Sequence, residues 1–152
     1  MCGGGVRVDP PDMPELLERR HQSVDNAVTA VIVLGIEALQ GSLTISDFQV
    51  AVQRLERAIR PWDSVVNLAP RTVGVLCTSL SNAREADAIA ARLADVVRAP
   101  MAVGDAVRQV GVCVGSSVVE AGEEPGDAFG RAREAMRRMR AARRSLVVPP
   151  PR

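Results

Sequence analysis

The order of apolar and polar positions predicts alternating strands and helices along most of the chain. Residues 27–36 are almost all apolar and largely β-branched, which is typical of a buried strand. From Ser46 onward the apolar residues recur at helical spacing, so we expect a helix that Ser46 caps and Pro61 ends. The inward positions of this helix are Phe48, Val52, Leu55 and Ile59.

Two further apolar runs, Ser64 to Leu68 and Val73 to Cys77, are separated by a short segment that contains Pro70. This pattern predicts a β-hairpin whose turn keeps the proline out of the strand ladder. Asn82 then resembles the start of a capping box, because Glu85 follows three residues later. The helix that begins here has an apolar stripe formed by Ala86, Ile89, Ala90, Leu93 and Val97.

The last part of the chain predicts one more strand and one more helix. Residues 107–119 alternate weakly and are expected to form a strand, paired with a short one near Ala102 across Gly104-Asp105. A final helix is expected from Gly126 to Arg144, with Phe129, Ala132, Met136 and Met139 facing inward. The element order is that of an α/β (α+β) protein with a ferredoxin-like βαββαβ core, an antiparallel sheet with helices on one face.

Length and the two chain ends divide the sequence into three parts. With 152 residues, of which 47% are hydrophobic, the chain can bury one core, so we expect one domain over residues 24–146. Residues 1–23 are predicted to be a flexible leader that is loose up to Pro11 and includes a short helix from Pro14 to His21. Residues 147–152 form a Pro-rich tail that is also expected to be loose.

Composition argues against several function classes. The net charge of +1 argues against a general polyanion binder, and the seven Arg residues between positions 131 and 144 favour a solvated helix face over a nucleic-acid site. His21 is the only histidine, so we expect no zinc site, no His-based catalytic site and no cofactor. The three cysteines lack C-x-x-C spacing, which predicts a reduced, cytoplasmic chain, and no apolar run is long enough to cross a membrane.

A motif surrounds the predicted hairpin. Arg60 and Asp63 form R-x-x-D, and five residues separate Asp63 from Ala69-Pro70-Arg71-Thr72-Val73. This frame resembles the catalytic hairpin of GGDEF domains, the diguanylate cyclase family, in which R-x-x-D stands five residues ahead of G-G-D-E-F. The resemblance extends over about residues 26–146, and Arg140 stands where the family has a phosphate-contacting Lys in A-M-Y-x-A-K.

The resemblance implies that this chain has lost the catalysis of the family. The first strand of cyclases ends in a pattern such as I-D-L-D, whose first Asp binds the metal, and Gly35 stands in its place. The second carboxylate ligand comes from the signature, where this chain has Arg71 and Thr72. Since Mg²⁺ requires hard oxygen ligands, we expect no metal site, no catalytic residues and no enzyme activity.

The resemblance also implies that a regulatory nucleotide site is retained. In many cyclases R-x-x-D binds the product cyclic di-GMP together with an Arg of the next helix, and Arg60, Asp63 and Arg92 match these positions. A guanidinium group suits both phosphate and guanine. A structural role for the motif stays open, because a helix C-terminus favours a cation and an Asp can cap a turn. Trp62 can stack on a base or serve as a packing or contact surface.

The function that the resemblance implies is therefore a catalytically inactive GGDEF-like signalling domain that binds cyclic di-GMP through R-x-x-D. The alternative is a protein-protein interaction or dimerisation module without nucleotide binding. Such a module would pair with a second copy of itself or with a partner signalling protein, through the sheet edge or the Arg-rich last helix. Calorimetry with cyclic di-GMP distinguishes the two.

Overall fold

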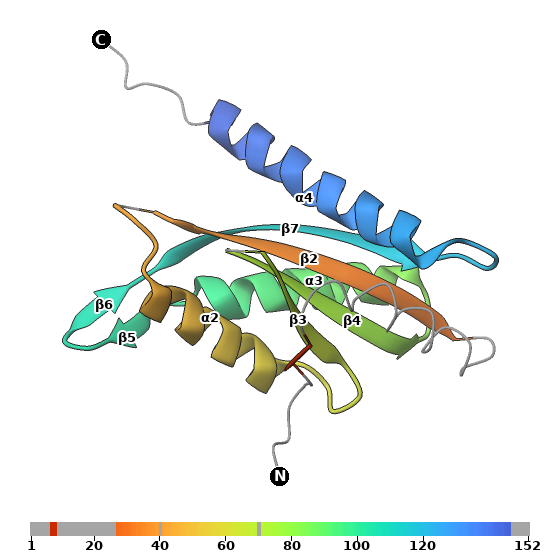
Figure 1. Ribbon diagram of the computed structural model, residues 1–152, viewed down its shortest axis with the longest axis horizontal. Coiled ribbons are helices and arrows are strands. Elements are labelled where there is room, and N and C mark those ends of the chain that lie inside the picture. Colours follow the sequence, from red (N-terminus) through yellow and green to blue (C-terminus); the bar gives the residue numbers. More distant parts are fainter. Residues whose placement is uncertain (1–6, 9–26, 40, 70, 147–152) are drawn as a thin grey trace.

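The computed structural model describes residues 7–8, 27–39, 41–69 and 71–146 (Figure 1). These form a sheet with helices on both sides and a small separate hairpin. The strands are β1 (Arg7–Val8), β2 (Val28–Ala38), β3 (Ser64–Ala69), β4 (Thr72–Leu80), β5 (Met101–Val103), β6 (Ala106–Arg108) and β7 (Val110–Val119). The helices are α2 (Ile45–Ala58), α3 (Ala83–Arg98) and α4 (Pro125–Leu146).

The main sheet has the strand order β1-β3-β4-β2-β7. The central strand β2 runs antiparallel to both neighbours, so that Ile32 faces Val75 of β4 on one side and Ser116 of β7 on the other. β3 and β4 form the antiparallel hairpin that the sequence predicts. The ferredoxin-like α/β class with an antiparallel central sheet is therefore confirmed, and the strands and helices predicted over residues 27–144 all exist, with differences in some of their bounds.

The helices cover both faces of the sheet, whereas the sequence led us to expect them on one face. α2 and α3 lie on one side and α4 on the other (Figure 1). Ile32 and Leu34 of β2 pack with the core beneath α2 and α3, while Val31 and Val33 pack with the core beneath α4. The reason is the continuous apolar run of β2, which has no polar face and therefore needs cover on both sides.

The helix starts are set by side-chain caps. α2 begins two residues earlier than expected, because Thr44 and not Ser46 is its cap. Thr44 Oγ1 accepts a hydrogen bond from the backbone N–H of Asp47 at 3.0 Å, and the Asp47 carboxylate accepts one from the Thr44 N–H at 3.1 Å. Asn82 caps α3 as predicted, but the Glu85 carboxylate accepts from Ser81 N–H and not from Asn82.

One strand and the burial of one residue in the C-terminal half differ from the prediction. The strand expected over residues 107–119 is divided, since β5 and β6 form a separate hairpin around Gly104, which has a φ of 62°. In α4, Ala132 and Met136 are buried as expected, but Met139 is 39% exposed. Its Sδ accepts a hydrogen bond from the Val114 N–H at 3.1 Å, so Met139 covers the edge of β7 and does not enter the core.

Two residues of the predicted leader form a short strand, β1. Arg7–Val8 pairs in parallel with Val65 and Val66 of β3. Two residues of backbone pairing leave no hydrophobic pattern that would reveal them in a sequence. The short helix predicted from Pro14 to His21 and the tail over residues 147–152 lie outside the described residues. None of the described helices is both long and apolar enough to cross a membrane.

Candidate nucleotide site and the turn between β3 and β4

Arg60 and Asp63 bind each other at the connection between α2 and β3. Arg60 Nε and Nη2 each donate a hydrogen bond of 2.9 Å to the Asp63 carboxylate, and the Arg60 backbone N–H donates a third of 3.1 Å. Arg60 Nη2 also donates to the carbonyl of Thr78 at 2.8 Å, which ties the turn to β4. Arg60 and Asp63 therefore form an ion pair that is closed, in the sense that each side chain binds the other. This pair connects the end of α2, the start of β3 and strand β4.

The ion pair is unequally buried. The Asp63 side chain is 1% exposed, whereas 22% of the Arg60 side chain is exposed. The hydrogen bonds that Arg60 donates to the Asp63 carboxylate raise the pKa of the guanidinium above its ordinary value, and partial burial opposes this effect. Asp63 is thus positioned to orient Arg60, and of the two side chains only Arg60 presents substantial surface to solvent.

Arg92 and Trp62 lie beside this ion pair. Arg92 extends from α3 and donates through Nη1 to the carbonyl of Ala58 at 3.0 Å, close to the end of α2. Trp62 is 48% exposed, and Arg60 Cζ lies 5.3 Å from the centroid of its ring, which is a cation–π contact. The structure therefore brings the three residues predicted for a nucleotide site to one end of α2.

A groove between α2 and α3 adjoins this group and was missed by the sequence analysis. Its volume is about 370 Å³. Arg54, on its wall, donates to the carbonyls of Val96 at 3.2 Å and Pro100 at 2.6 Å. The only signal in the sequence was an Arg at every third position near the end of α2. The lining residues are Arg54, Arg57, Ala58, Val96 and Ala99.

The position of the expected metal ligand is filled by a cation. Gly35 lies in β2 next to α4, and a Cβ built on it would overlap the Arg140 guanidinium and approach Met136 Sδ to 2.8 Å. Arg140 Nε in turn lies 3.7 Å from the Glu37 carboxylate. A side chain at this position therefore requires the Arg140 guanidinium and Met136 Sδ to shift.

Arg140 and Arg71 share a polar pocket of about 260 Å³ at this end of β2. Arg71 has a φ of 69°, a strained value for a residue with a side chain, and its carbonyl accepts a hydrogen bond from Ile36 N–H at 2.7 Å. Two guanidinium groups beside one glutamate do not fit a divalent cation. Among the described residues no three His, Cys, Asp or Glu side chains are grouped to hold a metal ion.

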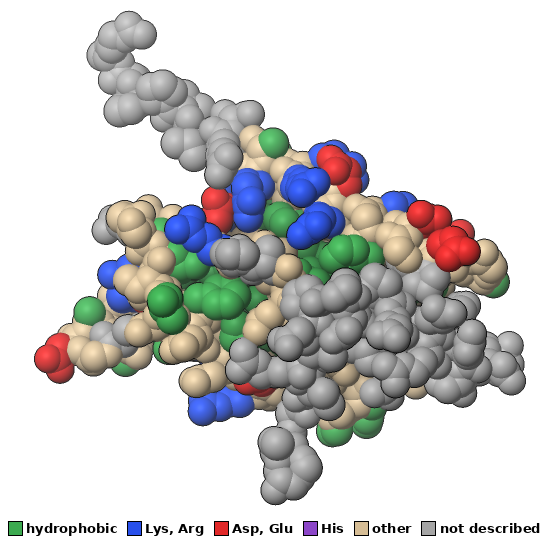
Figure 2. Space-filling model, in the orientation of Figure 1, with side chains coloured by type: hydrophobic (Ala, Val, Ile, Leu, Met, Phe, Trp, Pro, Cys, Tyr) green, Lys and Arg blue, Asp and Glu red, His purple; other side chains and the backbone are tan. Residues whose placement is uncertain are grey.

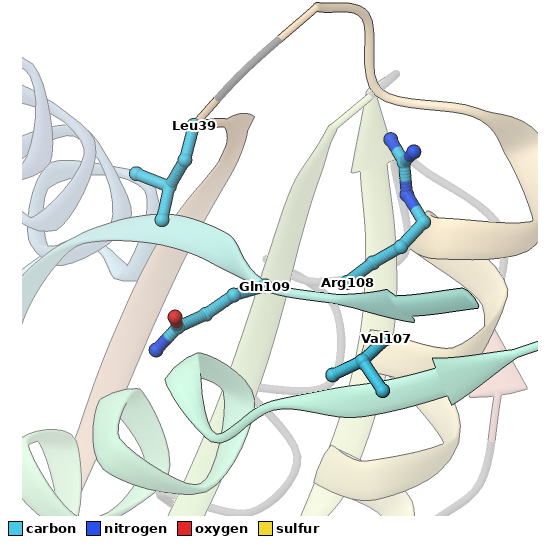
Figure 3. A pocket seen from close by; sticks show the side chains of 4 residues that line it. All are labelled: Leu39, Val107, Arg108 and Gln109. Atoms are coloured by element: carbon cyan, nitrogen blue, oxygen red, sulfur yellow. The ribbon is translucent and has the colours of Figure 1, made fainter.

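A third hollow lies at the β6 end of the molecule, lined by Leu39, Val107, Arg108 and Gln109 (Figure 3). Arg108 Nη2 is 2.8 Å from the carboxylate of Asp47 and 3.2 Å from the carbonyl of Ser42, so its charge is already used. The hydrogen bond from the Thr44 backbone N–H has the largest effect on Asp47 and lowers its pKa. Hydrogen bonds with the side chains of Arg108 and Thr44 lower it further. Leu39 and Val107 are 57% and 77% exposed and add two apolar side chains to a lining that is otherwise polar.

The chain is similar to several solved GGDEF domains. The GGDEF domain of YfiN (TpbB) from Pseudomonas aeruginosa is 16% identical with a TM-score of 0.78, covering 88% of this chain and 84% of that one. The FimX GGDEF domain from the same organism is 12% identical with a TM-score of 0.74, covering 93% and 96%. The GGDEF domain of DgcB from Caulobacter crescentus, in complex with c-di-GMP, is 11% identical with a TM-score of 0.73, covering 91% and 88%.

At these identities the solved structures show a common fold. No curated protein matches the chain. The family model described as diguanylate cyclase, GGDEF domain matches residues 46–146, which is about two thirds of the chain and includes the R-x-x-D segment, the hairpin and α4. The element order, the antiparallel sheet and this match agree, and the chain belongs to the GGDEF domain family.

Proposed function

We propose that this GGDEF domain is a cytoplasmic, catalytically silent signalling domain that binds cyclic di-GMP through Arg60, Asp63 and Arg92. The observation that carries the proposal is the convergence of Arg60 and Arg92 at the end of α2, beside the exposed ring of Trp62. A guanidinium group offers paired donors to phosphate and to the acceptor edge of guanine, and an aromatic ring offers a stacking surface.

The three residues have different roles in this proposal. Asp63 is buried and bound by Arg60, so it positions the guanidinium and does not reach the ligand unless the pair opens. Arg60 Nη1 and Arg92 Nη2 make no hydrogen bond with another described residue, which leaves donors on both side chains for an anionic ligand. The DgcB domain, solved in complex with c-di-GMP, supports this choice of ligand.

Loss of catalysis is the second part of the proposal. Arg140 occupies the space beside Gly35, and Arg71 adds another positive charge nearby. Phosphoryl transfer depends on positioned metal ions and charge stabilisation more than on covalent protein chemistry. With guanidinium groups where the family places carboxylates, we expect no conversion of GTP in the presence of Mg²⁺.

Calorimetric titration with cyclic di-GMP tests the proposal. We expect micromolar binding by the wild-type chain, loss of binding in Arg92→Ala, and unchanged binding in Arg84→Ala. Arg84 is an exposed Arg at the opposite end of α3 and serves as the matched control. Absence of heat from folded wild-type protein would refute nucleotide binding, and formation of cyclic di-GMP from GTP would refute catalytic silence.

A protein-interaction role is the second candidate, and the exposed apolar pair Leu39 and Val107 favours it (Figure 3). The diguanylate cyclase SiaD has been solved in complex with its activator SiaC, so a GGDEF protein can bind a protein partner. If this surface pairs two copies of the chain, light scattering will give a dimer mass for wild type and a monomer mass for Val107→Asp. A monomer for both would refute self-association through this surface.

A further inference from the structure

The groove between α2 and α3 is shallow and open, and its lining combines positive charge with apolar surface. Two Arg side chains, Arg54 and Arg57, line it, and no acidic residue does. Its remaining lining, Ala58, Val96 and Ala99, is apolar. An apolar surface between positive charges matches a ligand with a flat aromatic part and an anionic part.

The cations around the groove divide into two that bind carbonyls at a helix end and one that does not. Arg54 donates to carbonyls at the end of α3, and Arg92 donates to the Ala58 carbonyl at the end of α2. These contacts offset the negative ends of both helix dipoles. Arg57 is exposed and makes no ion pair or hydrogen bond with another described residue, so its guanidinium is available for a ligand.

The nearby acid on α3 does not cancel this charge. Asp95 is bound by Arg98 at 2.8 Å and so is compensated within its own helix. The groove is also continuous with the site proposed above, because Ala58 contributes to its lining and its carbonyl binds Arg92. A ligand held by Arg60 and Arg92 can therefore extend into the groove.

We propose that this groove is the second half of the nucleotide site, in which Arg57 contacts phosphate and Ala58, Val96 and Ala99 pack against one guanine of cyclic di-GMP. The inference rests on the proposed function and adds Arg57, which is outside R-x-x-D. A volume of about 370 Å³ lies near the lower end of small-molecule pockets, which suits one half of a cyclic dinucleotide and not the whole.

The test compares variants of the full chain by calorimetric titration with cyclic di-GMP. Arg57→Ala is expected to weaken the Kd about tenfold, as for loss of one charge-assisted hydrogen bond. Val96→Glu places a carboxylate in the apolar lining and is expected to weaken binding by more than tenfold. Arg84→Ala removes an exposed Arg from the far end of α3 and is expected to change the Kd less than twofold. Far-UV circular dichroism verifies that each variant is folded.

The results separate this inference from the function on which it rests. If wild type binds and Arg92→Ala abolishes binding, while Arg57→Ala and Val96→Glu leave the Kd unchanged, the groove is not part of the site and the proposed function stands. If folded wild type does not bind cyclic di-GMP at all, both are overturned. A selective loss in Arg57→Ala and Val96→Glu, with Arg84→Ala unaffected, supports the groove.

Discussion

The closed ion pair of Arg60 and Asp63 predicts a loss of stability when either partner is removed. Asp63→Ala deletes an acceptor of three hydrogen bonds, two from the guanidinium and one from the backbone. Breaking a buried pair by removing one partner costs about 3–5 kcal/mol of unfolding free energy. Arg60 keeps 22% of its side chain exposed, so water can replace part of what it loses, and we expect about 3 kcal/mol.

Because the two side chains are unequally buried, the two single variants should differ in their loss of stability. Arg60→Ala leaves a buried carboxylate without its partner, since the Asp63 side chain is only 1% exposed. Its destabilisation should therefore equal or exceed that of Asp63→Ala, and the double variant should lose clearly less than the sum of the two.

Urea unfolding followed by far-UV circular dichroism measures these free energies, and a loss of about 3 kcal/mol corresponds to a Tm decrease of about 10 °C for a domain of this size. A loss of unfolding free energy below about 1 kcal/mol in both single variants would refute the structural role, because exposed ion pairs contribute about that much or less. The same result would make Arg60 fully available to a ligand.

Three further outcomes follow from other contacts. Gly35→Ala should lower stability by about 1–3 kcal/mol because its Cβ would overlap the Arg140 guanidinium, and adding Arg140→Ala should restore most of the loss in urea unfolding. The pKa of Asp47 is lower in the folded protein than its ordinary value of 3.8, so the ionised carboxylate stabilises the fold fully above about pH 3.8. This stabilisation is lost as the pH falls through the lower pKa of the folded state. Asp47→Asn should therefore reduce the dependence of Tm on pH at the acid end of the profile. Burial raises the pKa of Cys77 to about 12, so with the other two cysteines replaced by Ser its reaction with a thiol reagent at pH 8 should occur only on unfolding.

The strands and helices were predictable where one local pattern decided them. A continuous apolar run identified β2, and the stripe of α3 from Ala86 to Val97 is buried as its spacing indicates. The placement of α4 was also present in the sequence, because a strand with no polar face requires cover on both sides. The parallel pairing of Arg7–Val8 was not predictable, since backbone pairing of two residues leaves no periodicity.

The candidate site was predictable only in its local part. Spacing of three residues places Arg60 and Asp63 within reach of each other, but it does not show that the pair closes on itself or reaches the Thr78 carbonyl. Similarly, the groove beside Arg57 depends on how the ends of α2 and α3 meet, and that contact joins residues far apart in the sequence. Motif matching thus singled out Arg60, Asp63 and Arg92 as candidates, but it did not predict the groups to which they bind in the structure.

Gly35 and Arg140 illustrate why two departures from a family pattern should be interpreted together. From the sequence they are two separate departures, a missing carboxylate on β2 and a longer cation on α4. In the structure they explain each other, because the missing Cβ of Gly35 provides the space that the Arg140 guanidinium fills. If an aspartate alone were restored, the Arg140 guanidinium would have to shift to admit its Cβ and would then pair with the carboxylate in competition with a metal ion. Reversal therefore requires a change on both β2 and α4, and the Arg71 charge would still oppose a cation there.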